Sequence, residues 1–254
     1  MTLFSSLFRR RGPRAFTIPE GVRAIAVGDV HGRRDLLERM LEAVDALRRA
    51  DPREEEHLLF LGDLIDRGPD SRGVLDLLVA RRESDPTLTI LAGNHEEMLL
   101  AILDGDSDSL AEWLRFGGQE CIESYGLAAA DLLAVPPDQA RALLAASLPE
   151  AHLALMRAMG DRFALGDYLF VHAGIRPGIA IADQQPQDLR WIRAPFLASK
   201  ADHGVMVVHG HSISTTPEER PNRIGIDTGA FASGTLTALC IDGPADRRFL
   251  TVTS

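Results

Sequence analysis

The sequence Gly62-Asp63-Leu64-Ile65-Asp66-Arg67-Gly68 directly follows an apolar run at residues 58–61. A short apolar run that ends at glycine and aspartate predicts a buried strand, with the polar block in the loop after it. This loop brings together two carboxylates and a guanidinium. A single block of this kind is more often a turn than a site, so its meaning depends on the rest of the chain.

Four further blocks have the same placement, each just after a short apolar run. They are Gly28-Asp29-Val30-His31-Gly32, Gly93-Asn94-His95-Glu96, Val171-His172-Ala173-Gly174 and His209-Gly210-His211. Strands that end along one edge of a sheet bring their following loops together, so residues far apart in the sequence can meet there. The pattern predicts one site rich in oxygen and nitrogen, as a two-metal phosphoester hydrolase requires.

The composition limits the class of protein. The chain has 254 residues, of which 45% are hydrophobic, and a formal net charge of −10 at pH 7. This length and apolar content predict one α/β domain with a helical insertion. The negative charge argues against a sequence-independent nucleic-acid partner. Divalent cations would still make a local pocket positive, so phosphate anions can be attracted.

The cysteines and the N-terminal sequence bear on the cellular compartment of the protein. Cys121 and Cys240 lie far apart and match no zinc-ribbon spacing, so we expect no disulfide and a reducing cytoplasm. No apolar run reaches the roughly 18 residues of a membrane span, so no stable membrane insertion is expected. Arginines at 9–11 and 14 follow a short apolar stretch, the reverse of signal-peptide order. We expect residues 1–21 to form a flexible basic tail and 22–254 the domain.

The first half of that domain alternates strand and helix patterns. Strands are expected at 22–27, 58–61 and 87–92, and helices at about 33–49, 71–82 and 95–103. This βαβαβα order predicts parallel strands joined by right-handed crossovers.

The second half begins with an Ala- and Leu-rich stretch at about 106–161, which predicts a helical insertion beside the site. Apolar runs then follow at 168–171, 205–208, 223–226, 235–241 and 249–252. Their close spacing predicts a second, more antiparallel sheet. Two sheets with helices outside would make a four-layer α/β/β/α sandwich.

The five blocks resemble the motifs of the phosphoprotein phosphatase (PPP) superfamily of calcineurin-like metallophosphoesterases: GDxHG, GDxxDRG, GNHE, a later His after a strand, and a final GH. The bacterial and phage serine/threonine protein phosphatases are the most similar branch, and the diadenosine tetraphosphatases are cousins. The similarity covers about residues 22–254, because it extends through Trp113-Leu114-Arg115-Phe116-Gly117-Gly118, Ser124-Tyr125-Gly126, Leu189-Arg190-Trp191-Ile192-Arg193 and Asp227-Thr228-Gly229-Ala230. The resemblance also implies the four-layer fold.

The resemblance implies two divalent metal ions, bridged by Asp63. The ligands would be Asp29, His31 and Asp63 for the first ion, and Asp63, Asn94, His172 and His211 for the second. This set lacks thiolate, which favours Mn²⁺, Fe²⁺ or Zn²⁺, and Mn²⁺ is expected by analogy. His209 stays open between a ligand for metal or phosphate and a packed residue at a strand end. The aromatic residues Trp113, Phe116 and Tyr125 stay open between core and substrate groove.

Two ions roughly 3.5 to 4 Å apart can deprotonate a shared water near neutral pH and direct it at phosphorus. The leaving alkoxide needs a proton, and His95, next to Asn94, is the expected general acid. The resemblance implies that Asp66 orients His95 and that Arg67 and Arg193 bind the substrate phosphate. The alternatives are a helix cap for Asp66 and a solvated surface charge for Arg193 or its neighbour Arg190.

The expected function is that of a serine/threonine protein phosphatase acting on phosphorylated proteins or peptides. The alternative is a hydrolase of dinucleoside polyphosphates such as Ap4A, or of another nucleotide. The tetraphosphatases typically lack the Asp of GDxxDRG, whereas this chain has Asp66, which favours the protein phosphatases. A non-catalytic scaffold is disfavoured, because such proteins usually lose a ligand or the acid.

Overall fold

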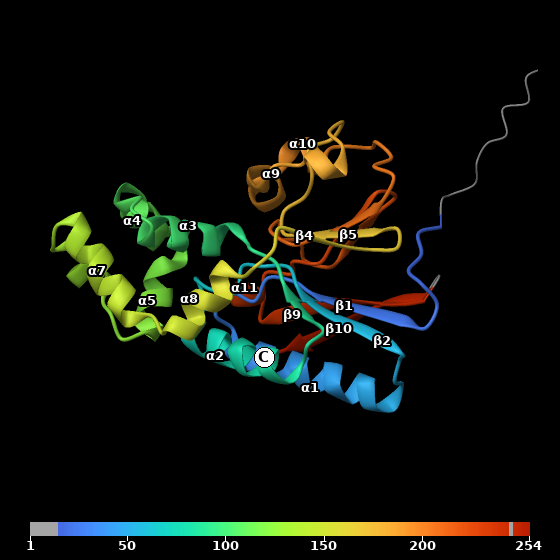
Figure 1. The fold of residues 1–254 in the computed structure, drawn as a ribbon, viewed down its shortest axis with the longest axis horizontal. Coiled ribbons are helices and arrows are strands. Elements are labelled where there is room, and N and C mark those ends of the chain that lie inside the picture. The colour runs from blue at the N-terminus through green and yellow to red at the C-terminus, as the bar shows by residue number, and fades with distance from the viewer. Residues whose placement is uncertain (1–14, 244–245) are drawn as a thin grey trace, which may run out of the picture.

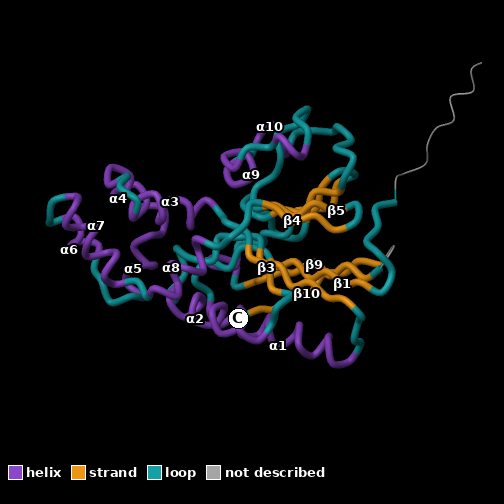
Figure 2. Tube along the Cα trace, viewed as in Figure 1, coloured by secondary structure: helices purple, strands orange, loops and turns teal. Residues whose placement is uncertain are grey.

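Residues 15–243 and 246–254, which the computed structural model describes, form two five-stranded sheets packed face to face with helices outside them (Figures 1 and 2). The predicted basic tail at 1–21 falls mostly outside these residues. Its described end packs on the domain: Thr17 donates hydrogen bonds to Asp167 from its backbone N at 3.0 Å and its hydroxyl at 3.1 Å. Ile18 is buried, so the packed chain begins before residue 22.

The first sheet has the strand order β10-β9-β1-β2-β3. Its strands are β1 (Val22–Val27), β2 (Glu55–Phe60), β3 (Leu88–Ile90), β9 (Thr235–Asp242) and β10 (Asp246–Thr253). The parallel pairing of β1 with β2 and of β2 with β3 is confirmed. The helices between and after them are α1 (Arg34–Ala50), α2 (Ser71–Ser84) and α3 (Asn94–Leu103), close to the predicted ranges.

The second sheet has the order β4-β5-β6-β8-β7. Its strands are β4 (Arg162–Leu165), β5 (Tyr168–Val171), β6 (Met206–His209), β7 (Glu218–Arg220) and β8 (Arg223–Gly225). The prediction for this half was wrong in two respects. The central strands β5, β6 and β8 are parallel, and only the edge strands β4 and β7 pair antiparallel. The last two predicted strands, β9 and β10, belong to the first sheet.

The position of β9 has a physical reason. It pairs antiparallel with β1, with Ala24 opposite Ile241 and Ala26 opposite Leu239. Without it, β1 would be an edge strand with unpaired amides and carbonyls. Because β9 lies inside the sheet, almost its whole length is buried, and its pattern does not say which sheet it joins.

Between α3 and β4 the described chain is helical. The elements are η1 (Ser107–Ser109), α4 (Leu110–Trp113), η2 (Leu114–Gly118), α5 (Gln119–Ser124), α6 (Ala129–Leu133), α7 (Pro137–Ser147) and α8 (Glu150–Arg157). They gather with α3 at one end of the sheets (Figure 1). Gly117 has φ 112°, which interrupts the helix at η2. Among the described residues, no helix combines the length and apolar character that a membrane span requires.

Three apolar clusters hold the layers together. Along β1, Ile25 and Val27 belong to the cluster shared with α1 and α2, while Ala24 and Ala26 belong to the cluster between the sheets. This alternation follows from the two-residue period of a strand. A third cluster lies between the second sheet and the outer helices. The remaining helices are η3 (Ile181–Asp183), α9 (Pro186–Trp191), α10 (Ala194–Leu197) and α11 (Ala230–Ser233).

Arg23 of β1 is a charged residue whose side chain is fully buried. Its guanidinium donates to Asp242 of β9 at 2.6 Å, to Glu56 of β2 at 2.9 Å and to the carboxylate of Asp51 at 2.7 Å. The burial cost of this charge is offset only when its partners are present. Arg23 therefore links both neighbours of β1 at the end of the sheet remote from the carboxyl end of β1.

We predict that Arg23→Met lowers the free energy of unfolding by about 3 kcal/mol, because it leaves carboxylates without their cation. Urea denaturation of the full chain measures this loss. The matched control is Arg157→Met, which breaks the exposed pair with Asp104 and should cost clearly less. Equal losses for the two variants would contradict a stabilising role for the buried pair.

Candidate metal centre

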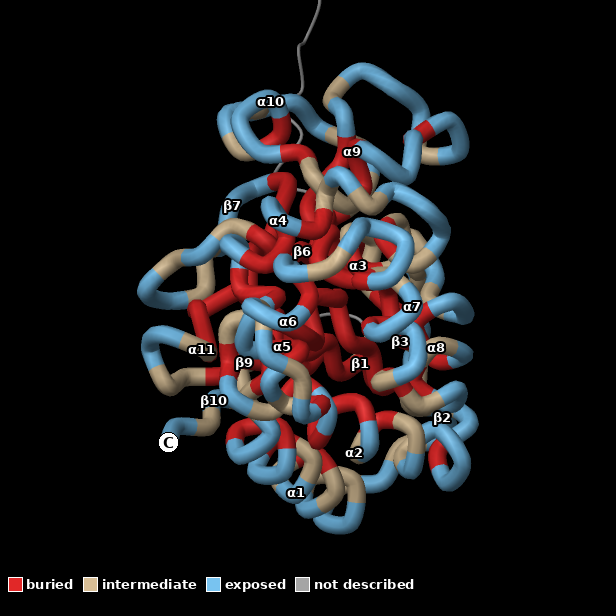
Figure 3. Tube along the Cα trace, turned by 90° about the vertical axis from the view of Figure 1, so that its left-hand side faces the viewer, coloured by how far each residue is buried: buried red, intermediate tan, exposed pale blue. Residues whose placement is uncertain are grey.

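The predicted site residues other than Arg193 lie just after the carboxyl ends of five strands. Asp29 and His31 follow β1, and Asp63, Asp66 and Arg67 follow β2. Asn94 and His95 begin α3, just after β3, while His172 and His211 follow β5 and β6. These strands are parallel within each sheet, so their carboxyl ends lie at one edge. Viewed from that end, buried residues run through the centre of the molecule (Figure 3).

Asp63 lies at the centre of the site. Its Oδ2 is 3.5 Å from Nε2 of His31, and its Oδ1 is 3.4 Å from Nε2 of His172. Within the part of the chain that the structure describes, two groups have ligand atoms close enough to share an ion: His31, Asp63 and His95, and Asp63, His172 and His211. Asp63 belongs to both groups, as expected of a residue that bridges two ions.

The orientation of the histidine rings fits metal binding. Nδ1 of His31 donates to the carbonyl of Ile65, and Nδ1 of His172 donates to the carbonyl of Leu61, both at 2.8 Å. These bonds fix Nδ1 as the donor and direct Nε2 toward Asp63, which is the arrangement of a histidine ligand with its supporting carbonyl. Donors of nitrogen and oxygen without sulfur suit the divalent ions named above.

The second group is crowded with ligand atoms. Nε2 of His172 lies 3.1 Å from Oδ1 of Asn94 and 3.2 Å from Nδ1 of His211. Burial lowers the pKa of His211, and likewise of His31, to about 3, so both rings are neutral. Burial also opposes charge on His172, but the carboxylates of Asp63, Asp29 and Glu96 together outweigh it and raise the pKa of His172 to about 10. The cluster therefore favours a positive charge here, whether a proton or a cation.

Asp29 lies next to these groups without belonging to either. Its carboxylate accepts the backbone N–H of His211 at 3.0 Å. Burial, and then the charge of Asp227, raise the pKa of Asp29 well above its usual range. Asp29 as a ligand of the first ion stays a prediction. Asp227 was missed as a neighbour of the site, although the sequence signal was present in Asp227-Thr228-Gly229-Ala230.

His95 and Asp66 form a buried pair. Nδ1 of His95 lies 2.6 Å from Oδ2 of Asp66, and both side chains are almost fully buried. Burial lowers the pKa of His95, but the charges of Asp63 and Asp66 outweigh it and raise the pKa above its ordinary value. The helix-cap alternative for Asp66 was wrong, because the cap of α2 is Asp70, which accepts the backbone N–H of Gly73.

Both predicted phosphate-binding arginines reach the cluster. One guanidinium nitrogen of Arg67 donates to Nε2 of His31 at 3.1 Å, and the other lies 2.9 Å from Nε2 of His95. Arg193 donates to Nε2 of His211 at 3.0 Å. Its neighbour Arg190 is instead paired with Asp161 at 2.6 Å. The guanidinium groups therefore border the two metal-binding groups from different loops.

Three residues left open by the sequence are buried and belong to neither ligand group. His209 is buried against Phe196, and its Nε2 accepts from Arg223 at 3.3 Å. Trp113 and Tyr125 are core residues. Phe116 differs, because its side chain is 52% exposed.

Glu96 was also missed as part of the site, since an acidic residue in a first helical turn is normally solvated. Its carboxylate is fully buried and accepts the backbone N–H groups of Asp63, Leu64, Ile65 and Gly93 at 2.7 to 3.3 Å. It therefore joins the loop after β2 to the start of α3.

The backbone is strained at the site. Among the described residues, positive φ angles outside glycine occur at His31 (44°), Asp63 (49°), Asp66 (72°), Arg67 (67°) and His211 (62°). Left-handed backbone costs a non-glycine residue roughly 1 to 2 kcal/mol. All five are predicted site residues, which is the distribution expected where function fixes geometry.

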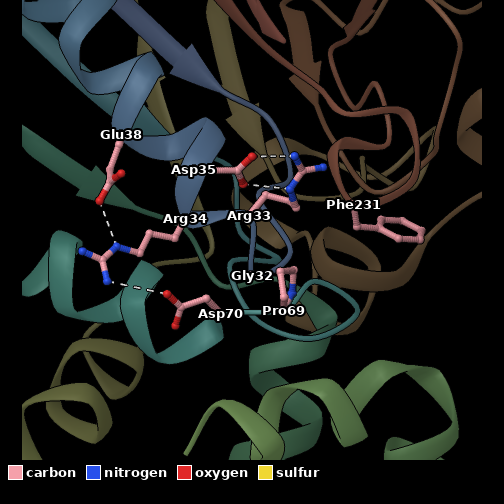
Figure 4. A pocket seen from close by; sticks show the side chains of 8 residues that line it. All are labelled: Gly32, Arg33, Arg34, Asp35, Glu38, Pro69, Asp70 and Phe231. Carbon is pink, nitrogen blue, oxygen red and sulfur yellow. Dashed lines mark hydrogen bonds and ion pairs between the residues drawn. The ribbon is translucent and has the colours of Figure 1, made fainter. Parts of the chain in front are cut away.

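Two cavities share Phe231 in their linings, and Arg67 lines one of them. Phe231 packs under the Arg67 guanidinium, 5.0 Å from its carbon to the ring centre. The first cavity, of about 550 Å³, contains ion pairs of Arg33 and Arg34 with neighbouring carboxylates (Figure 4). The second, of about 470 Å³, is lined by Arg67 and Phe116.

The model of the calcineurin-like phosphoesterase family matches residues 22–230. The chain belongs to this family. The resemblance of the motifs to calcineurin-like metallophosphoesterases is thereby confirmed, together with the fold. The family uses divalent metals to hydrolyse phosphoesters, and the two ligand groups agree with this chemistry.

The similar proteins carry two kinds of name. Serine/threonine-protein phosphatase 1 of Salmonella typhimurium is 44% identical over 92 residues, which is 36% of this chain and only 37% of that protein. The symmetrical bis(5'-nucleosyl)-tetraphosphatase of Serratia proteamaculans is 28% identical over 283 residues, covering 88% of this chain and 95% of that protein. The solved structure of a candidate diadenosine tetraphosphatase superposes with a TM-score of 0.64 at 22% identity, covering 95% and 99% of the chains. The solved structure has the same fold as this chain. The names of the relatives point to two different substrates, a phosphoprotein and a dinucleoside polyphosphate.

We predict that Asp63→Asn weakens the binding of both metal ions and removes most phosphoesterase activity, because both ligand groups share Asp63. Elemental analysis of the Mn²⁺-loaded protein measures the ions per chain. Asp108→Asn, an exposed carboxylate of the insertion, should keep the wild-type content. A variant at Asp63 that retains two ions and normal turnover would contradict the bridging role.

Proposed function

We propose that the chain is a dinuclear-metal phosphomonoesterase that hydrolyses phosphoserine and phosphothreonine in proteins or peptides. The observation that carries this proposal is the pair of His95 and Asp66, 2.6 Å apart and buried beside Asp63. A serine or threonine alkoxide is a poor leaving group and needs a proton as it departs. A histidine held by a buried carboxylate provides that proton.

Each of the predicted catalytic and phosphate-binding residues then has a defined role. Arg67 and Arg193 bind the phosphate oxygens, because a guanidinium matches phosphate with parallel N–H donors. The bound cations, with Mn²⁺ as our choice, supply Lewis acidity toward the attacking water and the phosphate. His95 transfers the proton on Nε2 to the leaving oxygen, while its Nδ1–H stays bonded to Asp66. Solvent then returns a proton to Nε2.

A second candidate is hydrolysis of dinucleoside polyphosphates of the Ap4A type. The observation that favours it is the tetraphosphatase relative that matches almost from end to end. The Asp66 carboxylate favours the first candidate, because the nucleoside diphosphate released from Ap4A is a good leaving group that needs little help from an acid.

We predict that the Mn²⁺-loaded chain cleaves phosphoserine or phosphothreonine peptides with a higher kcat/KM than Ap4A. A competition assay containing both substrates, with phosphotyrosine peptides and nucleoside monophosphates in parallel, measures the ratio. A clear preference for Ap4A with release of ADP would replace the first candidate by the second.

We predict that His95→Asn reduces turnover of a phosphoserine peptide by about 10² to 10⁴-fold, the usual contribution of general acid catalysis. Hydrolysis of p-nitrophenyl phosphate should fall much less, because p-nitrophenolate departs without a proton. Both ions should remain bound. As a control, His172→Ala should reduce the turnover of both substrates by about the same factor. The same behaviour of His95→Asn, with two ions still bound, would exclude the general-acid role.

A further inference from the structure

The carboxylate of Asp66 is also contacted by the helical insertion. Nε1 of Trp113, in α4, donates to Oδ2 of Asp66 at 2.8 Å. This is the same oxygen that faces Nδ1 of His95. Oδ1 of Asp66 has no N–H or O–H partner among the described residues, and the buried thiol of Cys121 acts on the same carboxylate. One oxygen therefore receives both N–H groups, one from the site and one from the insertion.

The indole of Trp113 has little freedom to move. Its side chain is fully buried, and a methyl group built on Gly118 would lie 2.4 Å from the indole ring. Gly117 packs as closely on Arg67, where a methyl group would meet the side chain at 2.5 Å. The kinked segment η2 therefore packs closely against both the indole of Trp113 and the side chain of Arg67.

We propose that Trp113 is a positioning residue for the general acid. Its N–H holds Oδ2 of Asp66 in the orientation that accepts Nδ1–H of His95, and this keeps Nε2 of His95 directed at the leaving oxygen. A carboxylate can rotate about its terminal torsion, and the left-handed backbone at Asp66 does not prevent it. The N–H of Trp113 removes this freedom. The inference rests on the proposed function, because it assigns His95 as the proton donor.

A purely structural role for Trp113 would have different consequences. The loss of packing alone would lower stability and reduce turnover of all substrates alike. The loss of positioning acts only where a proton must be supplied, so its effect depends on the leaving group. The matched control is Tyr125→Phe, which removes a different buried polar contact of the same insertion, the one with Nδ1 of His152 at 2.8 Å.

The first test compares kcat for Trp113→Phe and Tyr125→Phe in the full Mn²⁺-loaded chain. Trp113→Phe should lose about tenfold on the phosphoserine peptide, a part of the contribution of the acid, and keep p-nitrophenyl phosphate hydrolysis within about twofold. Tyr125→Phe should change neither. Trp113→Phe in the His95→Asn background should cause no further loss, because the two act as one unit. Equal losses on both substrates, or additive losses, would overturn the proposal.

A second readout needs no substrate. In protein labelled with ¹⁵N-histidine, the Nδ1–H resonance of His95 should shift or broaden in Trp113→Phe and stay in place in Tyr125→Phe. An unchanged resonance would overturn the proposal. If wild-type protein fails to cleave the phosphoserine peptide, the proposed function fails, while this resonance still tests the positioning. If Trp113→Phe does not fold, 3-benzothienylalanine introduced at position 113 removes the N–H and keeps the shape of the ring.

Discussion

The buried carboxylate of Glu96 is the constraint on which the rest of the site depends. Four backbone N–H groups from two loops point at it. Hydrogen bonds to a buried charge are short and strong, and removing the acceptor would leave all four amides unsatisfied. The loop after β2 and the start of α3 are therefore held in a fixed position relative to each other. Asp63 and His95 take their positions from it, and Asp63 in turn accepts the N–H of His95 at 3.1 Å.

Much of this arrangement could be predicted because it is local. The alternation of strand and helix fixes parallel strands, and parallel strands bring their following loops to one edge. Asp29, Asp63 and Asn94 could thus be placed together from three separate stretches of sequence, whereas His172 and His211 of the second sheet came from the family motifs. The family motifs added the assignment of Asp66 to His95, and the structure puts those two side chains in contact. Their catalytic roles stay predictions.

The remainder depends on contacts that no local pattern records. An apolar run shows that β9 is buried, but the choice of β1 as its partner is made by packing of distant segments. Trp113 has the spacing of a core residue and is one, and nothing in that spacing reveals where its N–H points. The left-handed backbone of Asp63 and Arg67 was equally hidden, because glycine is the residue that normally signals such a conformation.

The pairing of β1 with β9 has a consequence for the synthesis of the chain. During translation β1 (Val22–Val27) is made long before its partner β9 (Thr235–Asp242). Until then one edge of β1 has no strand beside it, and the early parallel core cannot close. His211 also arrives late, so a nascent chain holds only part of the ligands for the second ion. The full predicted ligand set of the second ion therefore exists only once the chain has been made through His211.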